Sequence, residues 1–493
     1  MKTLAHTSLA DYFETFRKNI IGIDEVIDTP YGVMPLVYTD WTASGRLYAP
    51  IEKRLTEDFA PYVANTHTKT STCGSIMTTA YEEARDIIKK HVHANENDVL
   101  IMAGHGMTGA VNKLQRILGL KIHEKFRDKI QIPSHEKPII FVTHMEHHSN
   151  QTSWLETIAD VEIIPYKNEK EIDFEAFEQL IQRYDNRPLK IASVTACSNV
   201  TGLTTDYHKI AGLIHQYNGY CFVDFACSAP YVNIDMHPNK EEQLDAIFFS
   251  PHKFLGGPGT SGVLIFNKKL YQNQIPDHPG GGTVVWTNPW KEHQYFDCIE
   301  AREDGGTPGF LQTIKTALAI KLKEKMGVEN ILKREHEILE ILLPAMQNIE
   351  GVEVLAGKFN DRLGVISFNI KDLHYDLGVK ILNDRFGIQT RGGCSCAGTY
   401  GHILLGINKE KSKEIIQKIE KGEVQEKPGW IRLSIHPTTS NHEVAYIIKA
   451  IRELAKNKTK WAEDYRLEKG VFKHKTYRNE EKLKKIVKQL FEI

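Results

Sequence analysis

The sequence predicts an α/β protein with a mainly parallel central sheet, followed by a smaller α+β domain. From Asp40 to about Thr260, short apolar strands alternate with amphipathic helices, which is typical of parallel sheets covered by helices. From about Pro308 the pattern changes to long helices and an alternating strand. The length of 493 residues agrees with two or three units, because a single core rarely grows beyond about 300 residues.

Five strands are expected in the first region, and each ends in a polar or glycine-rich segment. They are Val99–Ala103, Ile139–Thr143, Lys190–Val194, Tyr220–Phe225 and Ala246–Phe249. An open α/β sheet builds its site where the carboxyl ends of its strands meet, so these segments are the candidates for chemistry. A helix is expected over Asp206–Tyr217, with Thr205 as its cap and Gly219 just past its end.

The second region predicts three further helices and one strand. The first three elements are a helical stretch over Val328–Ile349, a strand over Val365–Ile370 and a helix near Tyr375–Phe386. A final helix opens with Ser440 and Glu443 at capping-box spacing. Its apolar face consists of Val444, Ile447, Ile448, Ile451 and Leu454.

The chain is expected to divide into four parts. They are an N-terminal segment on the small domain (1–37), a large domain (38–307), a small C-terminal domain (308–455) and a charged extension (456–493). The extension is rich in lysine and is expected to be peripheral and solvated. Its possible anchors are Phe472, Ile486, Leu490 and Phe491.

Composition excludes several classes of protein. Apolar residues make up 41% and charged residues 25%, which is globular composition. The net charge of −1 gives no reason to expect nucleic acid or an anionic membrane as a partner. No apolar run approaches the roughly 18 residues of a membrane span, and the N-terminus lacks an apolar signal core. Seven scattered cysteines are not a disulfide scaffold, so we expect a cytoplasmic protein with free thiols.

The segment 245–266 predicts a reactive lysine. A buried strand delivers Ser250, His252 and Lys253 to its end, and a glycine-rich turn follows. Burial lowers the pKa of a lysine toward the neutral amine, which can hold an aldehyde cofactor as a Schiff base. The alternative is a solvated lysine beside a turn. Asp224, near the end of another apolar strand, would be the partner of a protonated pyridine nitrogen, or else a cap of the following turn.

The segment 99–112 reads as strand, glycine loop and helix. The backbone amides of Gly106, Met107 and Thr108, with the Thr108 hydroxyl, suit a phosphate. The stretch 104–109 also matches a dinucleotide fingerprint, but the next strand ends in Thr143-His144 rather than in an acidic residue. A single-phosphate cofactor is therefore preferred, with an NAD(P) oxidoreductase as the alternative from another class.

Two further segments supply candidates for contacts with an aromatic cofactor. His147, in Glu146-His-His-Ser-Asn150, has an imidazole that would stack on the ring and shuttle protons. A metal held by His144, His147 and His148 is disfavoured, because no carboxylate or cysteine cluster of zinc-type spacing lies alongside. Asn199 is a neutral donor for a phenolic oxygen, or simply a turn residue.

These motifs, in this order, resemble the class V aminotransferase superfamily, which are fold-type I enzymes that use pyridoxal 5′-phosphate (PLP). Within it the chain is most similar to the cysteine desulfurase and selenocysteine lyase branch, with isopenicillin N epimerase-like proteins as close relatives. The likeness extends from about Tyr38 to Leu454. It implies a large domain with a mainly parallel, seven-stranded type of sheet flanked by helices, and a smaller α+β C-terminal domain.

The resemblance also implies a role for each matching residue. Lys253 would form the Schiff base, Asp224 would pair with the pyridine nitrogen, His147 would stack on the ring and Asn199 would touch the ring oxygen. Met107, Thr108, Ser250 and His252 would hold the phosphate, and Arg432 would clamp the substrate carboxylate with its guanidinium fork. The family forms homodimers, so Gly280–Thr283 and Gly305–Thr307 would reach across to the partner, with Thr283 contacting its cofactor.

The segment Arg391–Gly398, RGGCSCAG, distinguishes the branches of the family. Cys396 matches the persulfide-forming cysteine of the desulfurases, and Cys394 is an extra thiol two residues earlier. Near a cationic cofactor site the thiolate fraction should rise. The expected reaction cleaves the C–S bond of L-cysteine or its selenium analogue, giving alanine and an enzyme persulfide, which a sulfur-acceptor protein could then take.

Departures from the family pattern leave other reactions open. Cys227 stands where many relatives place Gln or His, and Gly109 where they often place Glu. The alternatives are an epimerase or aminotransferase in which Cys396 is structural, and a sulfur-carrier binding partner without catalysis. The last would require a lost cofactor, which the presence of Lys253 argues against.

Overall fold

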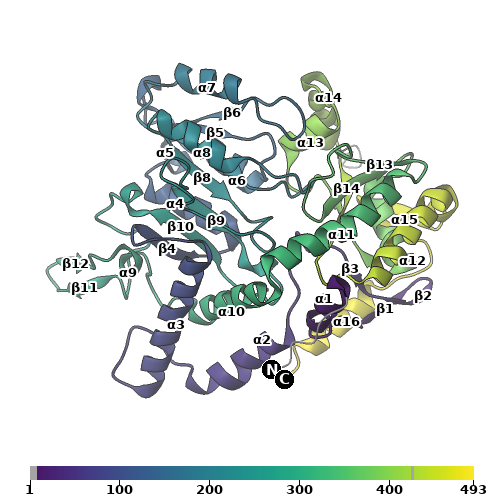
Figure 1. Ribbon diagram of the computed structural model, residues 1–493, viewed down its shortest axis with the longest axis horizontal. Coiled ribbons are helices and arrows are strands. Elements are labelled where there is room, and N and C mark those ends of the chain that lie inside the picture. The colour runs from purple at the N-terminus through teal and green to yellow at the C-terminus, as the bar shows by residue number, and fades with distance from the viewer. Residues whose placement is uncertain (1–7, 423–426) are drawn as a thin grey trace.

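The computed structural model describes residues 8–422 and 427–493 (Figure 1). Its larger sheet has seven strands, in the order β4 (Asp98–Ala103), β10 (Gly262–Asn267), β9 (Ala246–Phe249), β8 (Tyr220–Asp224), β7 (Lys190–Thr195), β5 (Ile139–Val142) and β6 (Asp160–Ile163). Only β10 runs antiparallel to its neighbours; the other adjacent pairs are parallel. The predicted mainly parallel sheet is confirmed.

Helices cover both faces of this sheet, which is why its strands are apolar throughout rather than alternating. One face packs against α4 (Gly106–Ile117) and α6 (His148–Leu155). The other packs against α7 (Phe174–Arg183), α8 (Tyr207–Gln216) and α10 (Phe310–Met326). Helix α3 (Thr72–His91) lies beside α10.

The smaller unit is a four-stranded antiparallel sheet with helices. Its strands are β13 (Val352–Val354), β14 (Val365–Ile370), β17 (Trp430–Ser434) and β16 (Arg391–Gly393), and its helices include α11 (Val328–Gln347), α12 (Tyr375–Phe386) and α15 (Asn441–Ala462). The first turns of α11 join the core of the large sheet through Ile331, and its later turns join the core of the small one. Figure 1 shows α11 running from one unit to the other. Helix α10 follows residue 308 but packs on the large sheet. The domain boundary expected at residue 308 therefore stays a prediction.

The remaining elements are short pairs and peripheral helices. The strand pairs are β1 (Val26–Thr29) with β2 (Gly32–Pro35), β3 (Val37–Tyr38) with β15 (Ile388–Gln389), β11 (Val284–Thr287) with β12 (His293–Tyr295), and β18 (Tyr465–Glu468) with β19 (Val471–His474). The helices are α1 (Leu9–Arg17), α2 (Ala49–Lys53), α5 (Glu124–Arg127), α9 (Ile299–Arg302), α13 (Gly398–Leu404), α14 (Lys409–Glu420) and α16 (Glu480–Leu490). In the described part of the chain, no helix is both long and apolar enough for a membrane crossing.

One local prediction was wrong. Asp206, not Thr205, is the N-cap of α8, and its side chain makes no cap hydrogen bond. The Thr205 amide bonds to the Ala196 carbonyl, and its hydroxyl is buried without a partner among the described residues. The extension is largely solvated, as expected: of its possible anchors, Phe472 packs against the small core, whereas Ile486, Leu490 and Phe491 are 42%, 78% and 82% exposed.

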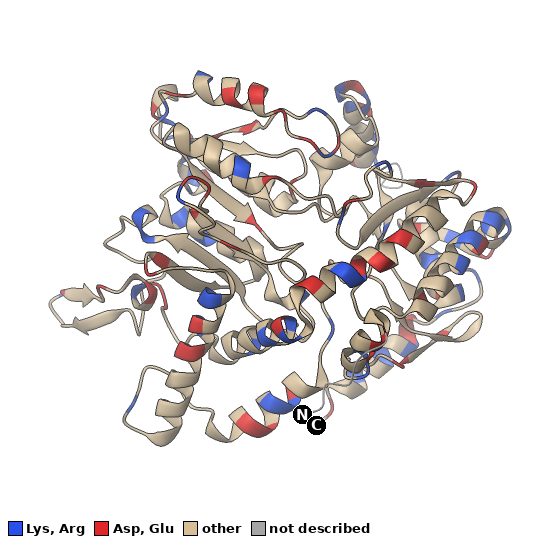
Figure 2. Cartoon of the chain, viewed as in Figure 1, with Lys and Arg blue, Asp and Glu red and all other residues tan. Residues whose placement is uncertain are grey.

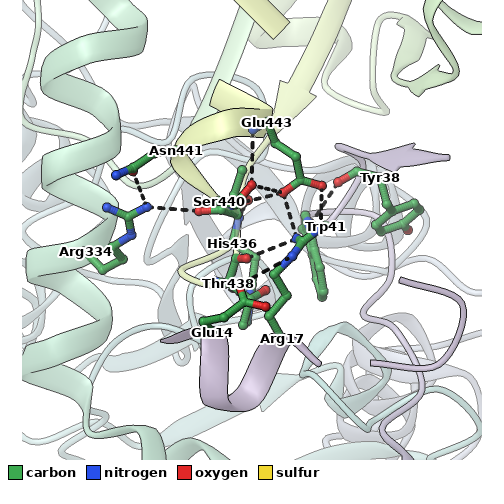
Figure 3. A network of polar contacts seen from close by, with 11 residues as sticks. Glu14, Arg17, Tyr38, Trp41, Arg334, His436, Thr438, Ser440, Asn441 and Glu443 are labelled. Atoms are coloured by element: carbon green, nitrogen blue, oxygen red, sulfur yellow. Dashed lines mark hydrogen bonds and ion pairs between the residues drawn. The ribbon is translucent and has the colours of Figure 1, made fainter. Parts of the chain in front are cut away.

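Acidic and basic residues are interspersed on the same helices, α11 among them, as the net charge of −1 leads one to expect (Figure 2). One partly buried ion pair joins the N-terminal helix to the small unit (Figure 3). Arg17 donates to both carboxylate oxygens of Glu443, at 2.7 and 3.0 Å. Glu443 also accepts the backbone N–H of Ser440, and the Ser440 side chain accepts the backbone N–H of Glu443 at the start of α15. The predicted capping box is therefore confirmed. A single carboxylate thus serves both the helix cap and the contact with α1.

Two substitutions at Glu443 separate these roles. We expect Glu443→Ala to lower the free energy of unfolding by about 2–3 kcal/mol, because it removes the cap and leaves the Arg17 charge uncompensated. Glu443→Gln keeps a capping side chain and should cost about 1 kcal/mol less. Urea unfolding followed by circular dichroism measures both. Equal losses in the two variants would show that the charge on Glu443 contributes nothing.

Candidate active site

A cavity of about 470 Å³ lies where the carboxyl ends of the large sheet's strands face the small unit. Ten of the predicted site residues line it: Met107, Thr108, His147, Asn199, Asp224, Ser250, His252, Lys253, Cys396 and Arg432. Thr283 does not line the cavity of its own chain; it is buried, and its hydroxyl donates to the Gly280 carbonyl at 2.6 Å. Residues at or after the ends of β4, β5, β7, β8 and β9 therefore converge with residues of the small unit on one space.

Lys253 projects into this cavity from a short 3-10 turn. Strand β9 ends at Phe249, and the turn Pro251–Lys253 follows at once. Burial lowers the pKa of Lys253, and the Arg432 charge lowers it further, while Cys227 and Asp224 act in the opposite direction. Across residues 8–422 and 427–493, no hydrogen bond or ion pair holds the Lys253 amine. It is available to a ligand.

Asp224 is the last residue of β8 and is 3% exposed. One carboxylate oxygen accepts the backbone N–H of Ala226 at 2.8 Å. Burial raises the pKa of Asp224 to about 6, against the effects of that hydrogen bond and of the Lys253 charge. A buried carboxylate with one backbone partner has capacity for a further donor, which a protonated ring nitrogen would supply.

The start of α4 forms a polar cradle at the cavity wall. The Met107 amide donates to the Ser250 hydroxyl at 2.8 Å, and the hydroxyls of Thr108 and Ser149 lie 2.6 Å apart. Gly106 has a φ of +60°, and a Cβ there would lie 2.9 Å from the Ser250 oxygen, so glycine is required for this close approach. A twelve-residue helix that begins with amides and hydroxyls at the cavity wall suits a phosphate.

The three histidines after β5 do not converge. His147 caps α6 by accepting the Ser149 amide at its Nδ1 (3.1 Å), and burial, then the charge of Lys253, lowers its pKa to about 3. His148 accepts the Gly398 amide at 2.9 Å. His144 stacks on Tyr166, at 4.3 Å between ring centroids. Over the described ranges, no group of three or more potential metal ligands is found. His147 is left as a neutral ring at the cavity wall.

Glu146 is a buried acid that the sequence reasoning did not single out. Its carboxylate accepts the Thr195 amide (2.8 Å), the Thr143 hydroxyl (2.6 Å) and the Asn150 amide (2.8 Å). Burial raises its pKa to about 8, while these hydrogen bonds favour the charged form. The Glu146 carboxylate links the segment after β5 to the end of β7. Because Glu146 directly precedes His147, this link fixes the position of the His147 ring. The signal for Glu146 was a charged residue in the short segment that follows a fully apolar strand.

Asp40 was also missed, and it organises the cationic side of the cavity. Its carboxylate contacts Arg432 at 2.8 Å and Arg391 at 2.9 Å. Arg432 is 3% exposed, and its other contact is with the Asn199 carbonyl at 3.2 Å. The Arg432 Nε and the Asn199 Oδ1 atoms are buried without partners in the described chain. Arginine and asparagine thus retain unused hydrogen-bonding capacity at the cavity.

A tight turn carries the two cysteines of the small unit into the same cavity. Cys394 is half-buried and Cys396 is exposed. Ser395 and Cys396 have φ values of +49° and +56°, and the Ala397 amide donates to the Cys394 carbonyl at 3.0 Å. Two central residues with positive φ closed by this hydrogen bond are the geometry of a type I′ turn. Cys197 and Cys227 also line the cavity, so four thiols surround it.

Comparisons with known proteins agree with this geometry. Residues 37–447 match the family described as aminotransferase class-V. Proteins named probable cysteine desulfurase are 30% identical over 381 residues in Halalkalibacterium halodurans and over 377 residues in Staphylococcus aureus, each covering 76% of this chain and 86% of the relative.

Solved structures show the same fold. The apo cysteine desulfurase of Thermococcus onnurineus superposes with a TM-score of 0.71 at 24% identity, and covers 90% of this chain and 98% of its own. The cysteine desulfurase CsdA of Escherichia coli gives a TM-score of 0.70 at 19% identity with the same coverage. The fold-type I architecture predicted from the sequence is confirmed.

The Asp40 contacts predict a large cost for its removal. We expect Asp40→Asn to lower the free energy of unfolding by about 3 kcal/mol, because it leaves the buried Arg432 charge without a counter-ion. The matched control is Asp361→Asn, whose side chain is 93% exposed in its pair with Lys170 and should cost no more than about 0.5 kcal/mol. Urea denaturation of both variants measures the difference. Similar losses in both would contradict a compensating role for Asp40.

Proposed function

Because this chain belongs to the class V aminotransferase family, whose members are PLP-dependent enzymes, we propose that it is a cysteine desulfurase. The proposed substrate is L-cysteine or its selenium analogue, and the proposed products are alanine and an enzyme-bound persulfide. The observation that carries the proposal is an exposed thiol, Cys396, on a turn that faces the cavity holding Lys253 and Arg432. A thiol at that place is needed for sulfur transfer and has no use in a simple transamination.

The residues present fit PLP. The amine of Lys253 has no partner in the described chain and suits the cofactor's aldehyde. The spare acceptor capacity of Asp224 suits the pyridine nitrogen, and the cradle at Gly106, with Thr108, Ser250 and His252, suits the phosphate. The neutral ring of His147 suits one face of the aromatic ring. The Asn199 side-chain amide donates one N–H to the Ser395 carbonyl, and its second N–H suits the ring oxygen. When bound, PLP supplies an electron-accepting ring that is linked covalently to the substrate amine.

Four side chains would act on the substrate and cofactor. The guanidinium of Arg432 would bind the substrate carboxylate, with its orientation held by Asp40. Lys253, released to the neutral amine by its buried position, would take the proton from Cα and later return one to the substrate carbon. Asp224 would hold the ring nitrogen in its protonated form. His147 would stay neutral and exclude water from one face of the ring.

Cys396 would accept the sulfur. Its thiolate forms an S–S bond to the substrate sulfur as the Cβ–S bond breaks, and the electron pair of that bond stays with the carbon, which is protonated to alanine. Cysteine and one thiol thus give alanine and one persulfide, so no outside oxidant is required. Arg391 lines the same cavity as Cys396, so a cationic side chain stands in the space where the sulfur is transferred.

We also propose that two copies of the chain associate, each contributing to the other's site. The loop at Gly280–Thr283 bonds to Gly306 through the Gly281 carbonyl, and leads into the exposed hairpin β11–β12, where Trp286 and Trp290 are 46% and 77% exposed. An apolar groove of about 580 Å³ lies nearby, between α3 and α10. Exposed apolar surface of this extent is typical of an interface.

The seven cysteines are free thiols, which supports a reducing, cytoplasmic location.

The desulfurase proposal is tested by product analysis. With PLP and L-cysteine the protein should release alanine, and Cys396→Ser should reduce alanine formation at least about a hundredfold while the preparation stays yellow. Lys253→Ala should lose the covalent link, so borohydride should no longer attach the cofactor. Colour without alanine in the unmodified protein would retain the family and exclude the desulfurase. Exchange of the Cα hydrogen without C–S cleavage would favour the epimerase alternative.

The association proposal is tested by light scattering after size-exclusion chromatography. The unmodified protein should have the mass of a dimer, and the double variant Trp286→Ser/Trp290→Ser should shift it toward the monomer. The control, Leu490→Ser/Phe491→Ser, removes exposed apolar residues elsewhere and should leave the dimer intact. A monomeric unmodified protein would contradict the proposal.

A further inference from the structure

We propose that Cys394 is a second sulfur-handling thiol, which takes the sulfane sulfur from the Cys396 persulfide and stores it in a half-buried position. This inference rests on the proposed desulfurase function. It assigns an intramolecular sulfur transfer to a residue that the first reaction does not need. The enzyme would then hold two sulfur atoms per chain before any acceptor arrives.

The geometry of the turn places both thiols in the same cavity. Cys394 and Cys396 flank Ser395 in the type I′ turn and both line the cavity that contains Lys253. Two residues that are separated by only one cannot have Cα atoms more than about 7 Å apart, and the turn shortens that separation. Both thiols therefore open onto one cavity from neighbouring positions of one turn, which is the arrangement that exchange of sulfur between them requires.

The backbone between the two thiols is fixed from three sides. The Cys396 carbonyl accepts the His148 amide at 2.7 Å, and the Ser395 carbonyl accepts the Asn199 side-chain amide at 2.7 Å. The Trp430 indole N–H donates to the Ser395 hydroxyl at 3.2 Å. These contacts come from α6, from the loop after β7 and from β17, so three separate segments around the cavity hold the turn. Fixing two reacting groups in this way favours reaction between them over reaction with solutes.

The two thiols differ in their exposure to solvent, and Cys394, the proposed storage site, is the less exposed. Cys394 packs in part against an apolar cluster that includes Met145, Tyr400 and Trp430. Cys396 is exposed and shares the cavity with Arg391. Sulfur on Cys396 is thus open to solution, whereas sulfur on Cys394 is shielded on one side by apolar side chains. Packing alone does not account for Cys394, because its other side lines the reaction cavity.

The transfer is a thiol exchange that balances without an added reagent. The Cys394 thiolate attacks the outer sulfur of the Cys396 persulfide, an S–S bond to Cys394 forms and the S–S bond to Cys396 breaks. The electron pair of the broken bond leaves on the Cys396 sulfur as a thiolate, and one proton moves from the Cys394 thiol to solvent or to the new persulfide. There is no net oxidation. Cys396 is restored for a second molecule of L-cysteine.

The test counts alanine before any turnover through an acceptor. Holoenzyme is mixed with L-cysteine without any further reductant or acceptor, and alanine per chain is measured by rapid quench in the first phase, before free L-cysteine removes the persulfide. We expect a burst of about two equivalents from the unmodified protein and about one from Cys394→Ser. Cys298→Ser, which removes an exposed thiol outside the cavity, should keep the burst at about two. Fragmentation mass spectrometry should then locate one sulfur on each of Cys394 and Cys396.

A second measurement does not depend on catalysis. Cofactor-free protein is treated with glutathione persulfide as the sulfur donor, and the sulfur should appear on Cys394 in the unmodified protein but not in Cys396→Ser. A burst of one equivalent in the unmodified protein, an undiminished burst in Cys394→Ser, or sulfur confined to Cys396 would each overturn the relay. No alanine from any variant would overturn the desulfurase itself, so the two failures are distinguishable.

Discussion

The buried carboxylate of Asp40 is the interaction on which the site depends. It lies in the segment that follows β3, and that segment is tied to β17, since the Ser434 amide donates to the Thr39 carbonyl at 2.7 Å. From there it compensates Arg432 on β17 and Arg391 on β16. Without it, two guanidinium groups at the Lys253 cavity would lose the carboxylate that compensates both of them. A buried arginine can be kept ready for a carboxylate ligand only if a fixed anion stabilises it while the ligand is absent.

That arrangement explains what the sequence could predict and what it could not. Lys253 and Asp224 are each preceded by a buried strand, so their position at the edge of the sheet followed from the apolar pattern. Asp40 and Arg391 are 351 residues apart, and only the folded chain brings them together. Glu146 was overlooked because it lies outside the strand, and because one of its partners, the amide of Thr195, belongs to a different strand. Local pattern identifies strand ends, but pairing between distant segments is a property of the fold.

The misplaced helix cap has the same origin. Thr205 has the residue type of a cap, but the fold places it in the turn that bonds to Ala196, and the helix begins after Asp206. The exposure of Leu490 and Phe491 agrees with the solvated extension that the lysine-rich sequence predicts. The small-unit elements, β14 and α12, were predicted to the residue, because their apolar periodicity and their burial against one another agree. Prediction therefore succeeds where local preference and tertiary packing favour the same boundary.

The cysteine turn shows how the fold holds a costly local conformation. Two successive residues with side chains, Ser395 and Cys396, adopt positive φ, which costs of order 1–3 kcal/mol each when the surroundings do not impose it. Hydrogen bonds from His148, Asn199 and Trp430 impose it here. Asn199 and His148 also belong to segments that line the cofactor cavity, so any shift of the cavity wall moves the turn as well. Because the thiols are oriented by the same groups that form the site, their reactivity depends on the site being intact. A mobile loop carrying the same two cysteines would lack that dependence.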